Sequence, residues 1–169
     1  MARLPYEAAR QQSFWPVTNM KLRPPQEHEL EALSALCLRS KAVWGYDPAF
    51  LDACRVELTI RPDELASSAV CVAEHAGALV GVAQITIAGA TADLQKLFVE
   101  PGEIGLGVGK ALFGWASSTA KSLGARHLTI DADPDAVGFY RKMGATERGT
   151  VASGSIPGRV LPHLVLELP

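Results

Sequence analysis

The sequence predicts an α/β (α+β) fold, in which a mixed, mostly antiparallel central sheet carries helices on both faces. Residues 69–99 contain three apolar, β-branched runs in succession, a pattern typical of consecutive antiparallel strands. After Gly107 the hydrophobic period changes to that of a long amphipathic helix. Helical patterns also precede these strands, and short strands follow the long helix, so helices are available to cover the sheet.

Size and composition favour one globular domain. The chain has 169 residues, of which 48% are hydrophobic and 20% charged, and this is enough to bury a core. The net charge of −2 argues against a nucleic-acid-binding protein, and no apolar run reaches the roughly 20 residues of a membrane span. Residues 1–19 lack clean periodicity, so we expect an N-terminal extension followed by a single domain over residues 20–169.

The three cysteines, Cys37, Cys54 and Cys71, are odd in number and lack the spacing of metal ligands. We expect buried free thiols, which fit a reducing cytoplasm. The N-terminus has no apolar block followed by small residues, so a secretory signal is not expected. The sequence therefore favours a cytoplasmic protein, and it is compatible with a monomer or a homodimer.

The first half of the chain is expected to contain a strand over residues 20–24 and a helix within residues 28–40. A turn over residues 45–48 separates this helix from a second one that runs through Cys54. Strands then follow over residues 69–74, 78–89 and 91–101, and a turn containing Gly77 joins the first two as a hairpin.

The second half begins with a helix from Gly107 to Gly124. A short strand over residues 127–131 precedes a short helix over residues 133–144, for which Asp133 is a suitable N-cap. Closing strands are expected over residues 145–151 and 163–168. The apolar face of the long helix comprises Val108, Leu112, Trp115, Ala116, Thr119 and Leu123.

The stretch EIGLGVGK, residues 103–110, places three glycines at the start of the long helix. A helix N-terminus offers unpaired amides and the positive end of the helix dipole, and glycine lets a phosphate approach them. A turn that serves only close packing is the alternative. A Walker A loop does not fit, because Ala111 follows Lys110 where that motif needs Ser or Thr. A dinucleotide fingerprint does not fit either, because its last glycine falls on Lys110.

The segments LFVEPGEIGLGVGKALFGWA and LTIDADPDAVGFYRKMGA resemble the GNAT superfamily of acyl-CoA-dependent N-acyltransferases. The resemblance implies a GNAT-like sheet that splays where coenzyme A enters, with acetyl-CoA as co-substrate and its pyrophosphate on the loop amides. Gly107 and Gly109 occupy the two small positions of the family's loop, while Ile104 stands at its Gln or Arg position. The cofactor-binding residues implied are Leu97, Phe98, Val99, Ile104, Gly105, Leu106, Gly107, Val108, Gly109, Lys110, Asp133 and Phe139.

The resemblance places Tyr140 at the family's general acid, which protonates the departing thiolate; a tyrosine that only packs against Phe139 is the alternative. Asp133 replaces the family's Asn, so it cannot donate an amide hydrogen bond to the pantetheine arm. The backbone amides of residues 97–99 are expected to polarise the thioester carbonyl. The base is left open among Glu100, Glu74 with His75, and a water relay.

Other features of the sequence complete the picture. Trp44 and Tyr46 lie on a turn between helices, where the family usually builds its acceptor wall; a Trp44 that belongs to the core is the alternative. Arg159 lies in a Gly- and Pro-rich loop that can close the other side; an ordinary exposed connection is the alternative. Asp131, Asp133 and Asp135 could suggest a metal cluster, but capping explains Asp133, Asp135 suits the first turn of the helix, and no His accompanies them, so no metal site is expected.

We therefore expect an N-acetyltransferase that moves an acetyl group from acetyl-CoA to a primary amine of a small molecule by direct attack. It would need neither nucleic acid nor membrane. A non-catalytic acyl-CoA-binding module with the same fold and the acetylation of a protein amine are the alternatives.

Overall fold

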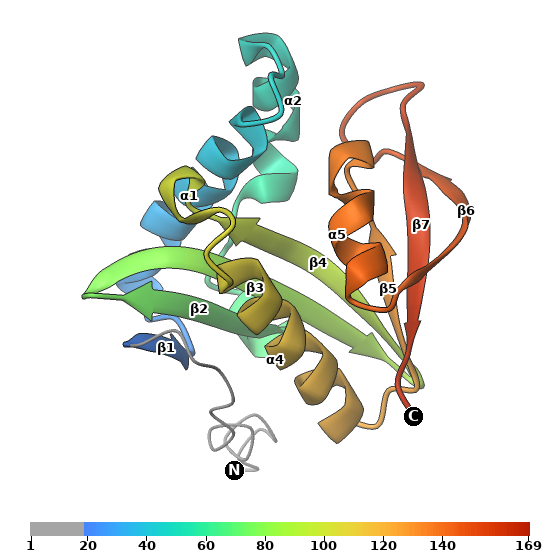
Figure 1. Cartoon of the computed structure of the whole chain (residues 1–169). Helices are drawn as coiled ribbons and strands as arrows, with labels where there is room; N and C mark the ends of the chain where they lie inside the picture. The colour runs from blue at the N-terminus through green and yellow to red at the C-terminus, as the bar shows by residue number, and fades with distance from the viewer. Residues whose placement is uncertain (1–18) are drawn as a thin grey trace.

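Seven strands form one sheet in the computed structural model, which describes residues 19–169 (Figure 1). The strand order is β1-β2-β3-β4-β5-β7-β6. Strands β4 and β5 run parallel, and every other neighbouring pair in this sheet is antiparallel. The predicted fold class, a mixed and mostly antiparallel sheet, is confirmed. The predicted extension lies outside the described residues except for Asn19.

The strands are β1 Met20–Arg23, β2 Ala69–His75, β3 Ala78–Ala88, β4 Thr91–Val99, β5 His127–Asp131, β6 Thr146–Ala152 and β7 Val160–Glu167. The α-helices are α1 Leu30–Ala42, α2 Pro48–Leu58, α3 Glu64–Ser67, α4 Val108–Ser122 and α5 Val137–Lys142. Short 3₁₀ turns are η2 Glu27–Glu29, η3 Pro101–Glu103 and η4 Pro134–Ala136.

Most element boundaries agree with the sequence predictions, and the exceptions have local causes. Strand β4 ends at Val99 rather than at residue 101, because Pro101 starts a 3₁₀ turn. Strand β7 begins three residues before the predicted start at residue 163, because Val160–Pro162 pairs with β6. The predicted hairpin turn is present: Ala76 and Gly77 both have positive φ, as a type I′ turn requires.

Two layers of helices cover the sheet. One buried cluster joins α1 and α2 to β2 and β3, through residues such as Leu33 and Val72. The opposite face packs on α4, where Leu112 and Phe113 are buried against the strands. In Figure 1, α1 and α2 lie above the sheet and α4 crosses in front of it. Helices on both faces are therefore confirmed.

The sheet opens between its two parallel strands. Pairing of β4 with β5 stops at Leu94 and Ile130, yet β4 continues to Val99. A β-bulge places Gln95 as an extra residue opposite β3. The two strands diverge beyond this point, as Figure 1 shows. We call this opening the fork; it leaves residues 95–99 without a partner strand on the β5 side.

Two further predictions concern the chain as a whole. Cys37, Cys54 and Cys71 are buried and unpaired, as expected from the sequence. Within residues 19–169, no helix combines the length and the apolar character needed to cross a membrane.

Candidate active site

The glycine loop leaves its backbone bare at the start of α4. Gly107, the N-cap of α4, has φ of 89°, and Gly105 has φ of 85°. Glycine adopts this left-handed conformation readily, whereas a residue with a Cβ atom is strained in it. The side chains of Ile104 and Leu106 are exposed, while Val108 is buried. The loop thus presents backbone amides at the N-terminus of α4.

The first turn of α4 has amides suited to an anion. Ala111 is the first residue whose N–H bonds back into the helix, donating to the Gly107 carbonyl at 3.1 Å. The amides of Val108 and Gly109 precede it and have no acceptor within the helix. They lie at the positive end of the helix dipole, together with the exposed residue Lys110. The loop therefore has the donors and the positive dipole end that an anion-binding site needs.

The amides of β4 face in alternating directions along the fork. The Glu100 N–H donates to the Val80 carbonyl of β3 at 2.8 Å. Because N–H groups alternate in an antiparallel ladder, the amide of Phe98 also faces β3, whereas those of Leu97 and Val99 face the fork. The hydroxyl of Ser40 accepts the Val99 N–H at 3.3 Å, so the Leu97 amide is the donor that is directed into the fork.

Tyr140 lies where α5 packs on the start of α4. Its ring centroid is 5.1 Å from that of Phe139 and 5.7 Å from that of Phe113. A Cβ atom added to Gly109 would lie 3.5 Å from the ring of Phe139. Tyr140 therefore packs between Phe113 and Phe139, and only 7% of its surface is exposed.

The hydroxyl of Tyr140 has no hydrogen-bond partner among residues 19–169. In the same part of the chain, every side-chain N or O atom that is fully enclosed has a hydrogen-bond partner. Because the Tyr140 oxygen has none, it is not fully enclosed and must be accessible from outside. Burial raises the pKa of Tyr140 well above its usual value of 10. The group therefore stays protonated and can act as a proton donor.

Asp133 connects three separate segments of the chain. It caps η4 as predicted, since its Oδ1 accepts the N–H of Asp135 at 3.1 Å. Its Oδ2 accepts the hydroxyl of Tyr46 at 2.6 Å and forms ion pairs with Arg159 at 3.3 Å and Lys41 at 3.6 Å. The sequence predicted Asp133 on the coenzyme and Tyr46 with Arg159 on the acceptor; the structure brings all three together.

Aromatic rings complete this group. Tyr46 stacks on Phe50 with ring centroids 4.0 Å apart. The guanidinium of Arg159 lies 4.9 Å from the Phe50 ring centroid, and the ammonium of Lys41 lies 5.5 Å from that of Tyr46. We call Lys41, Tyr46, Phe50, Asp133 and Arg159 the Asp133 cluster. Phe50 was not predicted from the sequence; it lies in the first turn of α2, where its N–H donates to the N-cap Asp47 at 2.8 Å.

Opposing effects set the pKa values in the Asp133 cluster. Burial alone would raise the pKa of Asp133, but the Tyr46 hydroxyl, the Asp135 amide and the cations of Lys41 and Arg159 lower it overall. Burial, followed by the adjacent carboxylate, raises the pKa of Tyr46 to about 12. The cluster therefore holds an ionised aspartate beside a protonated tyrosine.

Trp44 does not join the Asp133 cluster. It lies on the same turn as Tyr46, but 43% of its surface is exposed. The alternative that Trp44 belongs to the core is excluded by this exposure.

The base candidates from the sequence take part in ion pairs. Arg39 binds Glu100 through two hydrogen bonds of 2.9 and 2.7 Å. Arg23 donates to Glu74 at 2.8 Å. His75 lies 3.7 Å from a carboxylate oxygen of Glu103. Among the described residues, no contact of Glu74, Glu100 or Glu103 points its carboxylate into the fork.

A row of polar side chains that the sequence analysis missed follows β4, β5 and β7. The hydroxyl of Thr129 donates to Asp93 at 2.7 Å, and His163 lies 2.7 Å from a carboxylate oxygen of Asp131. The detectable signal was the alternation of β5, where His127, Thr129 and Asp131 are every second residue. The pairing of β5 with β7, which brings in His163, has no local signal.

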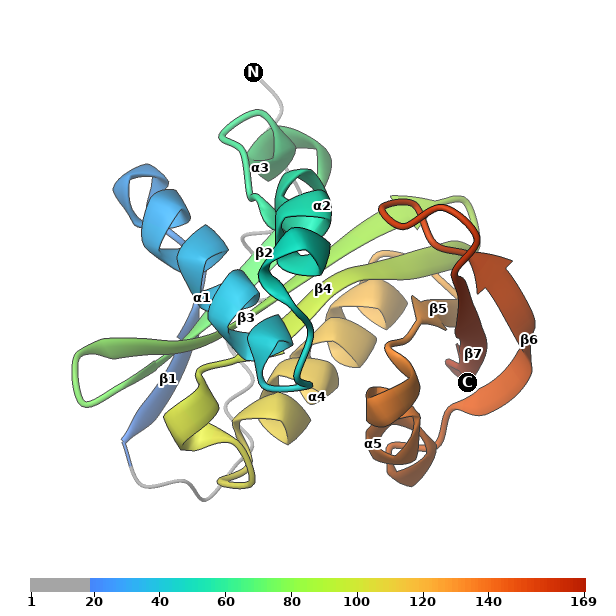
Figure 2. The same ribbon diagram turned by 90° about the horizontal axis from the view of Figure 1, so that it is seen from above.

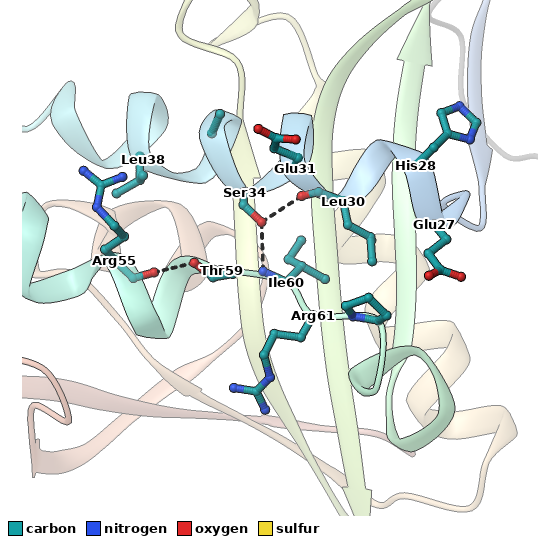
Figure 3. A pocket seen from close by; sticks show the side chains of 12 residues that line it. Glu27, His28, Leu30, Glu31, Ser34, Leu38, Arg55, Thr59, Ile60 and Arg61 are labelled. Carbon is teal, nitrogen blue, oxygen red and sulfur yellow. Dashed lines mark hydrogen bonds between the residues drawn. The ribbon is translucent and has the colours of Figure 1, made fainter.

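A separate hollow of about 960 Å³ lies on the outer side of α1. Figure 3 shows it between α1 and the segment after α2, where the Ser34 hydroxyl bonds the Leu30 carbonyl and the Ile60 amide. Its lining includes none of the site residues predicted from the sequence. It is therefore distinct from the fork.

Comparison with known proteins decides the family. Residues 52–152, more than half of the chain, match the model described as the acetyltransferase (GNAT) domain. The chain belongs to the GNAT acetyltransferase family. This family assignment makes the protein an acetyl-CoA-dependent N-acetyltransferase. A search among curated proteins found none that matches this sequence.

Solved structures agree in fold. The PaiA N-acetyltransferase of Thermoplasma acidophilum, solved with coenzyme A, has a TM-score of 0.72 and 17% identity, covering 89% of this chain and 99% of its own. A GCN5-related N-acetyltransferase from Rhodopseudomonas palustris has a TM-score of 0.73 and 22% identity, covering 92% and 100%. Nourseothricin acetyltransferase has a TM-score of 0.68 and 24% identity, covering 90% and 100%.

Proposed function

We propose that this acetyltransferase moves an acetyl group from acetyl-CoA to a primary amine of a small molecule by direct attack. The observation that carries the proposal is the fork. The Leu97 amide is directed into it, while the glycine loop forms the start of α4 beside it and Tyr140 packs against the same part of α4. Acetyl-CoA, when bound, supplies a thioester whose carbonyl carbon accepts an amine.

The glycine loop is proposed to bind the pyrophosphate of coenzyme A through the amides of residues 105–110. The left-handed glycines support this role, because they remove the side chains that would keep an anion away from the backbone. Ile104 contributes backbone only, and Phe139 packs against the same turn. Asp133 differs from the expectation: its carboxylate is engaged by the acceptor-side residues Tyr46 and Arg159, so we assign it to both substrates.

Two groups of the chain are proposed to act on the thioester itself. The Leu97 amide donates a hydrogen bond to the carbonyl oxygen as it becomes negative, a contribution worth about 100-fold or more in rate at other such sites. Tyr140 gives its proton to the departing thiolate. The buried position of Tyr140, with a hydroxyl that has no competing acceptor among the described residues, supports this role.

Direct attack is favoured over an acyl-enzyme. Burial raises the pKa of the Cys71 thiol to about 12, and it does the same for Cys37. A thiol becomes a nucleophile only as thiolate, so neither cysteine is suited to carry the acetyl group.

The Asp133 cluster is proposed to bind the acceptor. Its carboxylate and stacked rings suit an ammonium group, since a cation over an aromatic face gains about 0.5–2 kcal/mol. The loop between β6 and β7 reaches toward α2 in Figure 2, and Ser155 of this loop bonds Glu57 of α2. Arg159 of the same loop donates to the Tyr46 hydroxyl of the α1–α2 turn at 2.6 Å. The two segments therefore meet beside Asp133, which supports a small acceptor over a protein.

The test is thiol release from acetyl-CoA with a panel of amines, followed by mass spectrometry of the products. The panel contains amino acids, diamines, aminoglycosides and short peptides with a free N-terminus or lysine. Acetylation of small amines supports the proposal. Acetylation of the peptides alone would mean that the acceptor is a protein amine. Tight acetyl-CoA binding with no product from any amine would mean that the protein binds acyl-CoA without catalysis.

A further inference from the structure

The proposed transfer still lacks a base, since an amine must lose a proton as its bond to the carbonyl carbon forms. The carboxylates considered from the sequence are held in ion pairs with arginines. We propose that His163, oriented by Asp131, is the base that takes this proton. The inference rests on the function proposed above and adds to it the residue that acts on the acceptor.

The pair lies where β4 and β5 separate. The last residues paired between these strands are Leu94 and Ile130, and Asp131 is the next residue of β5. His163 lies directly opposite Asp131 in the ladder between β5 and β7. Both residues therefore border the mouth of the fork.

The pair is also on the required face of the sheet. Ile130 and Leu164 are buried in the core that α4 covers. Side chains alternate along a strand, so their neighbours Asp131 and His163 point to the opposite face. Tyr140 belongs to the same core as Ile130. The proposed acid and base thus flank the fork from opposite faces, so the amine can approach on one face while the thiolate leaves on the other.

The geometry of the pair leaves one ring nitrogen available. The Nδ1 atom of His163 lies 2.7 Å from Oδ1 of Asp131. With Nδ1–H donating to this carboxylate, Nε2 carries the lone pair. Among residues 19–169, no group bonds Nε2, and 27% of the side chain is exposed. An amine can therefore reach it.

Two acidic side chains share the face of the sheet on which His163 lies. Asp131 pairs with the imidazole from β5, Asp93 lies two strands away on β4, where it accepts the Thr129 hydroxyl, and the residue opposite His163 on β6 is Gly149, which has no side chain. Asp93 itself is a weaker candidate, because Thr129 and Gln95 occupy its oxygens.

The step balances as follows. The neutral amine nitrogen bonds to the carbonyl carbon while Nε2 of His163 takes one N–H proton. The C–S bond breaks, its electron pair leaves with the sulfur, and the Tyr140 hydroxyl gives that sulfur a proton. His163 then loses its proton to water and Tyr140 regains one from water, so one amide and one thiol form for each amine and thioester consumed.

The same two strands contain a matched control. His127 lies 2.8 Å from a carboxylate oxygen of Glu167, at the other end of the β5–β7 ladder and on the same face as Asp131. Four residues separate it from the fork side, or about 13 Å at strand spacing. His127→Gln therefore removes an equivalent pair that is remote from the fork.

The experiment compares wild type, His163→Gln, Asp131→Asn and His127→Gln with an amine that the wild type acetylates. We expect His163→Gln to lower kcat/KM by about 100-fold or more at neutral pH. Its rate should recover as the pH rises, because hydroxide can then take the proton that Nε2 would have taken. Asp131→Asn should give a smaller loss and a shifted pH profile. The acetyl-CoA dissociation constant and the melting temperature should change in none of the variants.

The outcomes separate this inference from the function on which it rests. A wild type that acetylates amines, together with a His163→Gln variant that keeps more than a third of kcat/KM, would overturn the base assignment alone. Equal losses in His163→Gln and His127→Gln would also overturn it, because they indicate a structural role. A wild type that acetylates no amine would overturn both proposals.

Discussion

The proposed coenzyme side of the fork comes from a nearly continuous part of the chain, residues 97–140, whereas the acceptor side is assembled from four distant segments. The coenzyme side relies on backbone amides at the start of α4 and on one tyrosine of α5. The acceptor side relies on side chains of the α1–α2 turn, η4, the β6–β7 loop and the ladder between β5 and β7. Backbone sites can be recognised from local sequence, while convergent side chains depend on the tertiary fold.

The largest expected effect is on the coenzyme side. Tyr140→Phe should lower kcat by about 100-fold or more while the acetyl-CoA dissociation constant stays the same, because the hydroxyl acts only on the leaving thiolate. The fold should persist, since this hydroxyl bonds no described residue. Stopped-flow or steady-state thiol release measures kcat, and calorimetry measures binding. A loss of less than about threefold would make Tyr140 a packing residue.

Gly107→Val tests the glycine loop. A valine at φ of 89° is strained, and its side chain would stand between the backbone and the pyrophosphate. We expect the dissociation constant of acetyl-CoA to rise about tenfold or more, equivalent to about 1.4 kcal/mol. Calorimetry measures the binding of acetyl-CoA and of the free amine separately, so an effect on the coenzyme side can be told from one on the acceptor side. Unchanged acetyl-CoA binding in a folded variant would refute the phosphate site.

Asp133→Asn tests the acceptor side with the helix cap intact, since asparagine caps as well as aspartate. Loss of the charge that holds Lys41 and Arg159 should raise the KM for the amine by about fivefold and change the KM for acetyl-CoA less. Asp135→Asn, an exposed position in the same turn, is the control. Equal changes in both Michaelis constants would mean that Asp133 contributes as much to acetyl-CoA binding as to amine binding.

The same variant tests the charge of Asp133 in the folded state. Because its pKa is below the ordinary value of 3.8, the stability from its ion pairs is present above about pH 4 and is lost as the pH falls through the folded-state pKa. The difference in unfolding free energy between wild type and Asp133→Asn should therefore be constant from neutral pH to about pH 4 and shrink below it. Urea denaturation at a series of pH values provides this difference.

Trp44→Ala has the smallest expected effect. Since Trp44 is exposed and lies outside the Asp133 cluster, the melting temperature should hardly change, and the KM for the amine should rise by about twofold. Tyr46→Ala should have the larger effect, because it removes the stacked ring and the hydrogen bond to Asp133. A Trp44→Ala effect as large as that of Tyr46→Ala would extend the acceptor site beyond the Asp133 cluster.

Local sequence was sufficient for most of the fold and for half of the candidate site. The change of period at Gly107 and the hairpin at Gly77 depend on near neighbours, so they were predicted correctly. The contact between Tyr46 and Asp133 joins residues 87 positions apart, and Asp131 meets His163 only because β7 inserts between β5 and β6. A single sequence has no periodic signal for such a pairing, so His163 could be proposed as the base only from the order of the strands.

The parallel ladder of β4 and β5 has only four residue pairs, from Thr91–His127 to Leu94–Ile130. This ladder alone joins the two halves of the described sheet. The Asp133 cluster links the α1–α2 turn, on one side of the fork, to η4 and the β6–β7 loop on the other. Breathing of the two halves about this ladder should be among the least costly large motions of the described chain. A molecule bound across the fork would hold the two halves together. Hydrogen exchange of the β5 backbone amides should therefore be slower when both substrates or their analogues are present.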